Sequence, residues 1–260
     1  SGKSAAVSFD STAISIDDVC AIAFELQRAT DEHAIKHVFA AYKKQLDLTD
    51  SEQKLYDALV PILEKHRAAT VKAILKGATV TFAALDAELQ AALLPTMVEQ
   101  VIEQATMLAE EIGPDFDPAD MATAASAWAS SYTYDLVQGI TDRTRQVVQK
   151  AVEQYGRTPG MTREQLEALL RPAFGNARAE SIAVTEVTRS AAAGVREYQE
   201  LLAVSGIAME RRWNTNHDDK TCAICGPLGG KLESEWAERF PDGPPGHPRC
   251  RCFVTLKVKK

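Results

Sequence analysis

Apolar residues recur three and four positions apart along most of the chain, from about residue 15 to residue 203. Ile22, Leu26 and Ala29 form one such line, which is the pattern of a helix with one apolar face. The same stretch is rich in Ala, Leu, Glu, Gln and Lys, all of which favour helices. No alternation typical of a strand occurs before Met209. We predict about six to eight helices. Because short connections place successive helices antiparallel, the expected fold is mainly α, with a body of long antiparallel helices.

Capping and turn residues indicate where these helices begin and end. Thr49 with Glu52 has the spacing of a capping box, and residues 162–165 repeat it. Pro61 falls inside the helical pattern that follows Thr49, and Pro95 falls inside the next one, so a kink or break is expected at each. The later helices are expected at residues 83–112, 119–155, 162–171 and 176–204.

The character of the sequence changes at Met209. Residues 210–213 and the alternating residues 253–258 are typical of two short strands. Between them, residues 226–248 contain five glycines and five prolines, too many for a helix or a continuous strand. We therefore predict that the helical body is followed by a small Cys/His module of α+β type, similar to a zinc ribbon.

Charge divides the chain at the same place. The whole chain has 29 basic and 36 acidic residues, but residues 210–260 hold 10 basic and 7 acidic ones. The preceding 209 residues are therefore strongly acidic, which argues against broad nucleic-acid binding. No apolar run is long enough for a transmembrane helix and no secretory signal opens the sequence, so we expect no membrane partner.

The candidate chemistry lies in the segment rich in Gly and Pro. A Cys-x2-Cys turn at residues 222–225 and a His-x2-Cys turn at residues 247–250 provide the four ligands that zinc prefers. So short a segment buries little apolar surface, and a structural Zn²⁺ would supply the order that packing cannot. In a strand Cys252 would point the same way as Cys250, so either is the fourth ligand. The candidate metal ligands are Cys222, Cys225, His247, Cys250 and Cys252.

A disulfide between the two cysteine clusters is the alternative to a metal. The lack of a secretory signal favours a reducing compartment, and therefore thiolates and metal. Asp218 is either an acceptor for the amides of the first turn or a solvated loop charge. Trp213 and Trp236 are expected to cover the small core of the module. His33 and His37 share a helical face but lack the Glu of a metalloprotease motif, so we interpret them as solvated.

A string of residues in the module carries a family resemblance. It consists of Trp213, Asp218, Thr221-Cys222-x2-Cys225, Leu228-x-Gly230 and Pro244-Pro245-x-His247-Pro248-x-Cys250-Arg251-Cys252. This string resembles the carboxy-terminal part of the Mu F-like (SPP1-type) phage head morphogenesis proteins, which are minor head proteins. In that family a helical region with a Thr-Glu pair precedes the module. Thr185-Glu186 occupies that place here, although Val184 stands where an Arg is expected.

The resemblance covers about residues 140–258 and suggests three parts. They are an N-terminal helical region at 1–139, the helical part of the head-morphogenesis domain at 140–207, and the Cys/His module at 208–260. It implies a structural protein of the virion head, present in the host cytoplasm during assembly, and not an enzyme. The implied partners are the phage portal protein and the major capsid protein, with packaged DNA as a further candidate, in prohead assembly and DNA packaging or delivery.

Two other functions remain open at this point. One is an HNH-like metal-dependent nuclease, in which His217 and Asp218 would act at the metal. The other is a zinc-ribbon module that binds nucleic acid, because basic residues surround the second cysteine turn and end the chain. Its candidate phosphate contacts are Arg249, Arg251, Lys257, Lys259 and Lys260.

Overall fold

The computed structural model describes residues 48–113, 115–215 and 221–259. Several sequence-based expectations fall outside these residues. They concern the apolar line from Ile22 to Ala29, the pair His33 and His37, and the loop residues His217 and Asp218.

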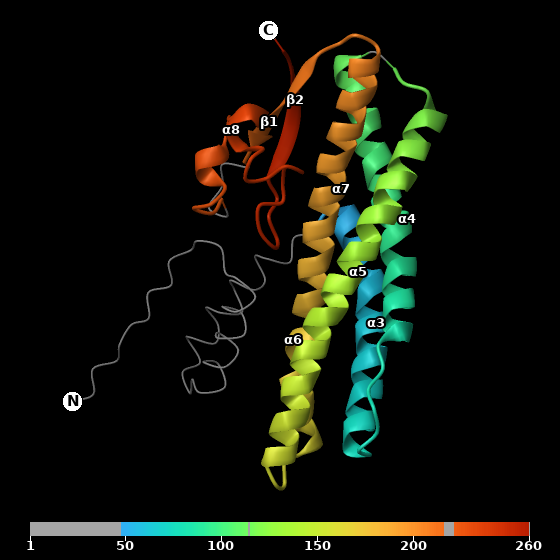
Figure 1. Cartoon of the computed structure of the whole chain (residues 1–260), viewed down its shortest axis with the longest axis vertical. Helices are drawn as coiled ribbons and strands as arrows, with labels where there is room; N and C mark the ends of the chain where they lie inside the picture. Colours follow the sequence, from blue (N-terminus) through green and yellow to red (C-terminus); the bar gives the residue numbers. More distant parts are fainter. Residues whose placement is uncertain (1–47, 114, 216–220, 260) are drawn as a thin grey trace, which may run out of the picture.

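Long helices lie side by side along the longest axis of the molecule (Figure 1). α3 (Asp50–Leu75), α4 (Ala83–Ile112) and α5 (Pro118–Arg157) follow one another through short turns and alternate in direction. The short α6 (Arg163–Phe174) leads into α7 (Asn176–Val204), which returns alongside the other helices. The predicted mainly α fold is confirmed.

Both predicted capping boxes are present. The Thr49 hydroxyl accepts a hydrogen bond from the Glu52 amide at 3.3 Å, and a Glu52 carboxylate oxygen accepts one from the Thr49 amide at 2.8 Å. Thr162 and Gln165 make the same reciprocal pair at the start of α6. Each box satisfies amide groups that the first turn of a helix leaves without a partner, so the sequence predicts these starts well.

Neither Pro61 nor Pro95 breaks its helix, so the prediction of a break at either position is wrong, whereas a kink there stays a prediction. α3 continues through Pro61 and α4 through Pro95, each as one helix. Both prolines lie on the exposed side of their helices, while leucines two residues away, such as Leu59 and Leu93, are fully buried. Water can bond to the carbonyl that each proline leaves unpaired, and the packing of the buried face outweighs the lost hydrogen bond.

Two groups of buried side chains form the core. The first lies among α3, the first half of α4, α5, α6 and the start of α7, and includes Leu59, Leu89 and Phe174. The second joins the second half of α4, the start of α5 and the end of α7 to the tryptophans and cysteines of the module. α4 and α7 approach closely at Gly194, where an added Cβ would lie 2.5 Å from the Val101 carbonyl oxygen. The module therefore shares a core with the helices beside it.

The module is built on a two-stranded antiparallel sheet. β1 (Met209–Asn214) pairs with β2 (Phe253–Val258), with Met209 opposite Val258 and Asn214 opposite Phe253. The segment between the strands carries a 3₁₀ turn, η1 (Gly226–Leu228), and a single helical turn, α8 (Glu233–Trp236). Both predicted strands are confirmed. Figure 1 shows the module beside α7, which β2 contacts directly.

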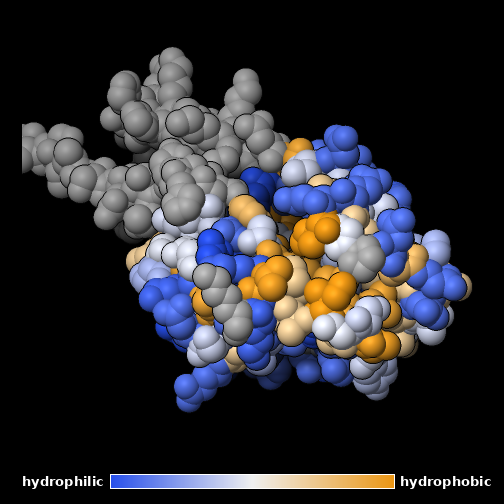
Figure 2. All heavy atoms as spheres, turned by 90° about the horizontal axis from the view of Figure 1, so that it is seen from above, coloured by the Kyte–Doolittle hydropathy of each residue, from blue (hydrophilic) through white to orange (hydrophobic). Residues whose placement is uncertain are grey.

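Apolar side chains reach the surface where α4 and α7 end. Seen from that end, orange apolar atoms lie in the middle of the face and hydrophilic residues surround them (Figure 2). Val204, the last residue of α7, is 88% exposed, and Ile112 at the end of α4 is also exposed.

Candidate metal centre

The five candidate ligands come from the two loops that the sheet brings together. Cys222 and Cys225 lie in the turn before η1, and His247 and Cys250 lie in the coil before β2. Cys252 directly precedes β2. All four cysteines are buried and His247 is half-buried. The pairing of β1 with β2 therefore places both cysteine clusters at one end of the sheet.

The ligand atoms form two overlapping groups, and each group is compact enough to hold an ion. The Cys222 sulfur is 3.0 Å from His247 Nε2, and the Cys225 sulfur is 3.6 Å from the Cys250 sulfur. Two overlapping groups share Cys225, and within each group all ligand atoms lie within 4.8 Å of one another. Two sulfurs that bind one tetrahedral zinc at about 2.3 Å lie about 3.8 Å apart. The observed sulfur separation fits that geometry, and none of the described cysteines is in a disulfide.

Contacts around the ligands orient two of them. The amide of Cys225 donates a hydrogen bond to the Cys222 sulfur at 3.3 Å, as expected for a Cys-x2-Cys turn around a metal. His247 Nδ1 lies 2.8 Å from the carbonyl oxygen of Pro248. A proton on Nδ1 would be donated to that carbonyl, which leaves the Nε2 lone pair directed at the cysteines. Such outer contacts fix the tautomer of a histidine that binds a metal.

The surroundings shift the pKa values of the cysteine thiols in different directions. Hydrogen bonds from Cys225 and Cys252 lower the pKa of the Cys250 thiol well below its usual range. The contact with Cys250 raises the pKa of Cys225, and it also raises the pKa of His247 to about 9 against the effect of burial. Burial raises the pKa of Cys222, but donation from the Cys225 and Ile224 amides outweighs it. A divalent cation at this point would allow several of these sulfurs to be thiolates together.

Arg249 fixes the second cysteine turn to α7. It is the one described non-glycine residue with a positive φ, 61°, a conformation in which most side chains are strained. Its amide donates a hydrogen bond to the Thr185 hydroxyl at 2.9 Å, and its guanidinium pairs with the buried Glu180 carboxylate. These contacts hold the backbone of Arg249 in an unusual conformation beside Cys250.

Arg251 fixes the same loop to α3. Its guanidinium makes two parallel hydrogen bonds to the Glu52 carboxylate, at 2.9 and 2.8 Å. Glu52 is 2% exposed and also caps the start of α3. Arg249 and Arg251 thus carry the Cys250 segment onto two different helices through buried carboxylates. Two-point pairing of this kind is the geometry for which the arginine fork is suited.

Aromatic residues close the module, as the sequence predicts. Trp213 is fully buried, with its ring 5.6 Å from that of Trp236 and 5.4 Å from that of Phe240. Arg211 lies over Trp236 and pairs with Glu233 at 2.5 Å. Large rings in edge contact supply apolar area in a segment that has few aliphatic residues.

A second polar group lies between α5 and α7. The Tyr132 hydroxyl donates to the Glu186 carboxylate at 2.9 Å, and Arg189 lies over the Tyr132 ring. Burial raises the pKa of Glu186 to about 7, although Arg189, Tyr132 and Arg178 oppose that shift. Glu186 belongs to the Thr-Glu pair, and its neighbour Thr185 receives the amide of Arg249. The pair therefore has one member inside the helical body and one at the module.

The structure brings all five predicted ligands together, but sequence reasoning missed the carboxylates that hold their loop. Glu52 is recognisable from sequence only as a helix cap, and Glu180 only as one of many acidic residues on a helix. The available signal is the pair Arg249 and Arg251 on either side of Cys250. Arginines next to buried ligands need counter-charges, but the sequence does not say which.

Comparison with known proteins gives one finding. Residues 142–255 match the family model described as phage Mu protein F like protein. That region begins in α5 and ends in β2, so it contains α7, the Thr-Glu pair and the whole candidate metal centre. No curated protein and no solved structure matched the chain. Among the described residues, no helix is both long enough and apolar enough to cross a membrane.

Proposed function

Because residues 142–255 carry a Mu F-like region, we propose that this protein is a phage minor head protein. It associates with the portal and the major capsid protein and supports prohead assembly and DNA packaging or delivery. Its place is the virion head, reached from the host cytoplasm during assembly. The family match is the observation that carries this proposal, and the division at residues 139/140 and 207/208 stays a prediction.

Within this function the Cys/His centre has a structural role. Cys222, Cys225, His247 and Cys250 would hold a zinc ion, with Cys252 beside them. Cys250 is favoured as the fourth ligand because its sulfur lies 3.6 Å from that of Cys225 and its proximity raises the pKa of His247. Four protein ligands leave no position for a reacting water, which is the arrangement of a structural zinc. The ion would fix the loop that Arg249 and Arg251 dock onto the helices.

The test is the composition of assembling particles. Epitope-tagged protein should co-purify with proheads and mature virions at a constant ratio to portal protein, measured by quantitative mass spectrometry. A Cys222→Ser/Cys225→Ser variant should be depleted from particles, whereas a Cys252→Ser variant should remain. Absence of the parent protein from both proheads and virions would refute the proposal.

The nucleic-acid-binding alternative is less well supported because Arg249 and Arg251 already pair with Glu180 and Glu52. Arginines engaged in this way are poorly placed for phosphate. The nuclease alternative depends on His217 and Asp218, so it is tested directly. Metal-dependent cleavage of DNA by the purified protein, abolished by His217→Ala, would favour a nuclease over a structural protein.

A further inference from the structure

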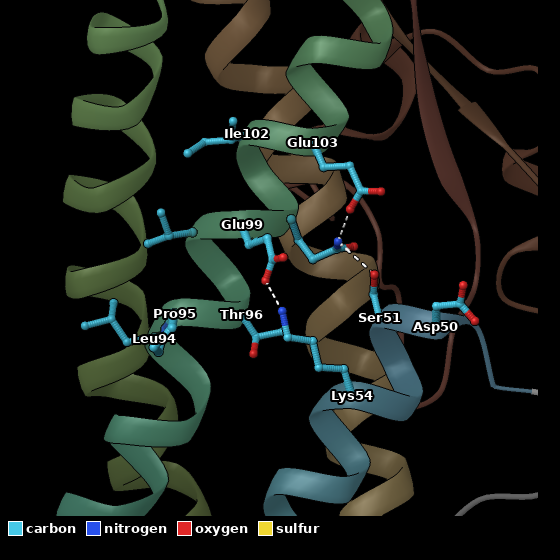
Figure 3. Close-up of a pocket in the computed structure, with 11 residues that line it drawn as sticks. Asp50, Ser51, Lys54, Leu94, Pro95, Thr96, Glu99, Ile102 and Glu103 are labelled. Atoms are coloured by element: carbon cyan, nitrogen blue, oxygen red, sulfur yellow. Dashed lines mark hydrogen bonds and ion pairs between the residues drawn. The ribbon is translucent and has the colours of Figure 1, made fainter.

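One groove of the helical body combines apolar and acidic side chains. It has a volume of about 920 Å³ and lies along the middle of α4, beside the start of α3. Leu94, Val98 and Ile102 are spaced four residues apart and form a half-buried line along α4. Figure 3 shows Leu94 and Ile102 on the side of α4 away from α3, with Glu99 and Glu103 nearer to α3.

The apolar line has the length of a short helical docking surface. Eight residues of a helix span about 12 Å, which is a little more than two turns. Grooves with apolar residues at this spacing bind the apolar face of an amphipathic helix. The groove is open, and no module residue lines it, so the metal centre and this surface are separate.

Charge around the groove is strongly acidic. From Gly77 to Asp142 the sequence has eleven acidic residues and no Lys, Arg or His. Lys54 of α3 pairs with Glu99, and Lys65 pairs with Glu88. Further along α4, the exposed residues Glu103, Glu110 and Glu111 form no ion pair within the part of the chain that the structure describes. The α4 side of the body therefore presents uncompensated negative charge next to an apolar line.

We propose that this groove binds a basic amphipathic segment of another head protein, an inference that rests on the proposed function. Its apolar side chains cover Leu94, Val98 and Ile102. Its Lys or Arg residues face Glu103, which has no ion pair among the described residues, and Glu99, which Lys54 already contacts. Charge favours this partner over three other candidates: DNA, a second copy of the same chain, and residues 1–47. DNA is repelled, a second copy of the same face brings acid against acid, and residues 1–47 hold 5 basic against 7 acidic side chains.

Photo-crosslinking in assembling particles tests the groove. The full chain carries p-benzoylphenylalanine at Ile102 or, in a second version that alters only an exposed residue, at Glu103. After irradiation, mass spectrometry identifies the crosslinked peptide. We expect a peptide of a different head protein, with net positive charge. A probe at Val152, exposed on α5 outside the groove, is the matched control and should not capture it.

Reversing the charge of the groove's acidic residues tests whether the crosslinked partner is held by its basic side chains. Glu99→Lys/Glu103→Lys should lower the crosslinking yield about tenfold, whereas Glu153→Lys/Glu164→Lys, on exposed residues outside the groove, should leave it unchanged. Particles that contain the protein but give no groove crosslink overturn this inference alone. So do crosslinks confined to residues 1–47, to a second copy, or to an acidic or uncharged segment. If the protein is absent from particles, the proposed function fails and this inference falls with it.

Discussion

Leucines fill the centre of the helical body, whereas four cysteines and two tryptophans fill the centre of the module. In the body, Leu59 and Leu89 are fully buried among other aliphatic side chains of α3, α4 and α7. In the module, the cysteine sulfurs lie among Trp213, Trp236 and a coil of glycines and prolines. Burial of aliphatic surface can stabilise the packed helices. A module of about fifty residues of coil and short strand needs an additional cross-link, such as a bound metal. The same chain therefore uses packing in one region and candidate metal ligands in the other.

Removal of the metal should have the largest effect, and it should affect the module rather than the helical body. Chelation, or the Cys222→Ser change, should unfold the module, because structural zinc in small modules contributes about 10–16 kcal/mol of binding free energy. The emission of Trp213 and Trp236 should shift to the red while the far-ultraviolet circular dichroism of the helices is largely kept. Cys252→Ser is the control and should keep the metal. Unchanged emission on chelation and in Cys222→Ser would show that the module does not depend on a metal.

A substitution in the helical body should destabilise the helices and leave the metal content of the module unchanged. Leu89→Ala removes a fully buried side chain and should lower the free energy of unfolding by about 3 to 4 kcal/mol, since a cavity remains. Thermal unfolding followed by circular dichroism measures this loss. Leu75→Ala, at an exposed position at the end of α3, is the control and should change little. Metal content should stay at the parental level, and its loss in Leu89→Ala would mean that the two regions are not separately stabilised.

The helical body also contains a buried carboxyl group, Glu186, which should make its stability depend on pH. The pKa of Glu186 is raised by burial from 4.5 to about 7, so the neutral carboxyl is favoured in the folded state. Its contribution is fully present below about pH 4.5 and is lost as the pH rises through about 7, a change of up to about 3 kcal/mol. The stability of the parent relative to Glu186→Gln should therefore fall between these values, measured by urea unfolding. A difference that does not vary with pH would mean that the pKa of Glu186 is the same in the folded and unfolded states.

The smallest effect is expected where the two regions meet. Arg251→Ala leaves the buried Glu52 carboxylate without its two arginine hydrogen bonds and should destabilise the junction by about 2 kcal/mol. Hydrogen exchange should then increase at the start of α3 and in the coil before β2. Arg251→Lys keeps the charge but not the paired geometry and should give an intermediate result. Equal protection in all three proteins would show that the ion pair does not join the regions.

Local chemistry explains which elements the sequence predicts. α4 ends at a glycine and α7 begins after one, as the sequence predicts, and β2 has the predicted bounds. The five ligand candidates gather in two overlapping groups, as their spacing suggests. Pro61 and Pro95 mislead because a local rule ignores the leucines that hold each helix from its other side. Glu52 and Arg251 are 199 positions apart, and no periodic pattern links them. Long-range charge pairing is a property of the packed helices, so it becomes visible only with the fold.

The pairing of Glu52 with Arg251 also has a consequence for synthesis on the ribosome. At about 5 to 20 residues per second, Arg251 emerges roughly 10 to 40 seconds after Glu52. During that interval α3 can form with its cap intact, but the carboxylate that later receives the arginine has no counter-charge from the module. The growing chain therefore leaves the Glu52 carboxylate without its arginine until the segment around Cys250 has been made. Any fragment released before that segment is made would expose the unpaired Glu52 carboxylate and the apolar side of α7 to chaperones and proteases.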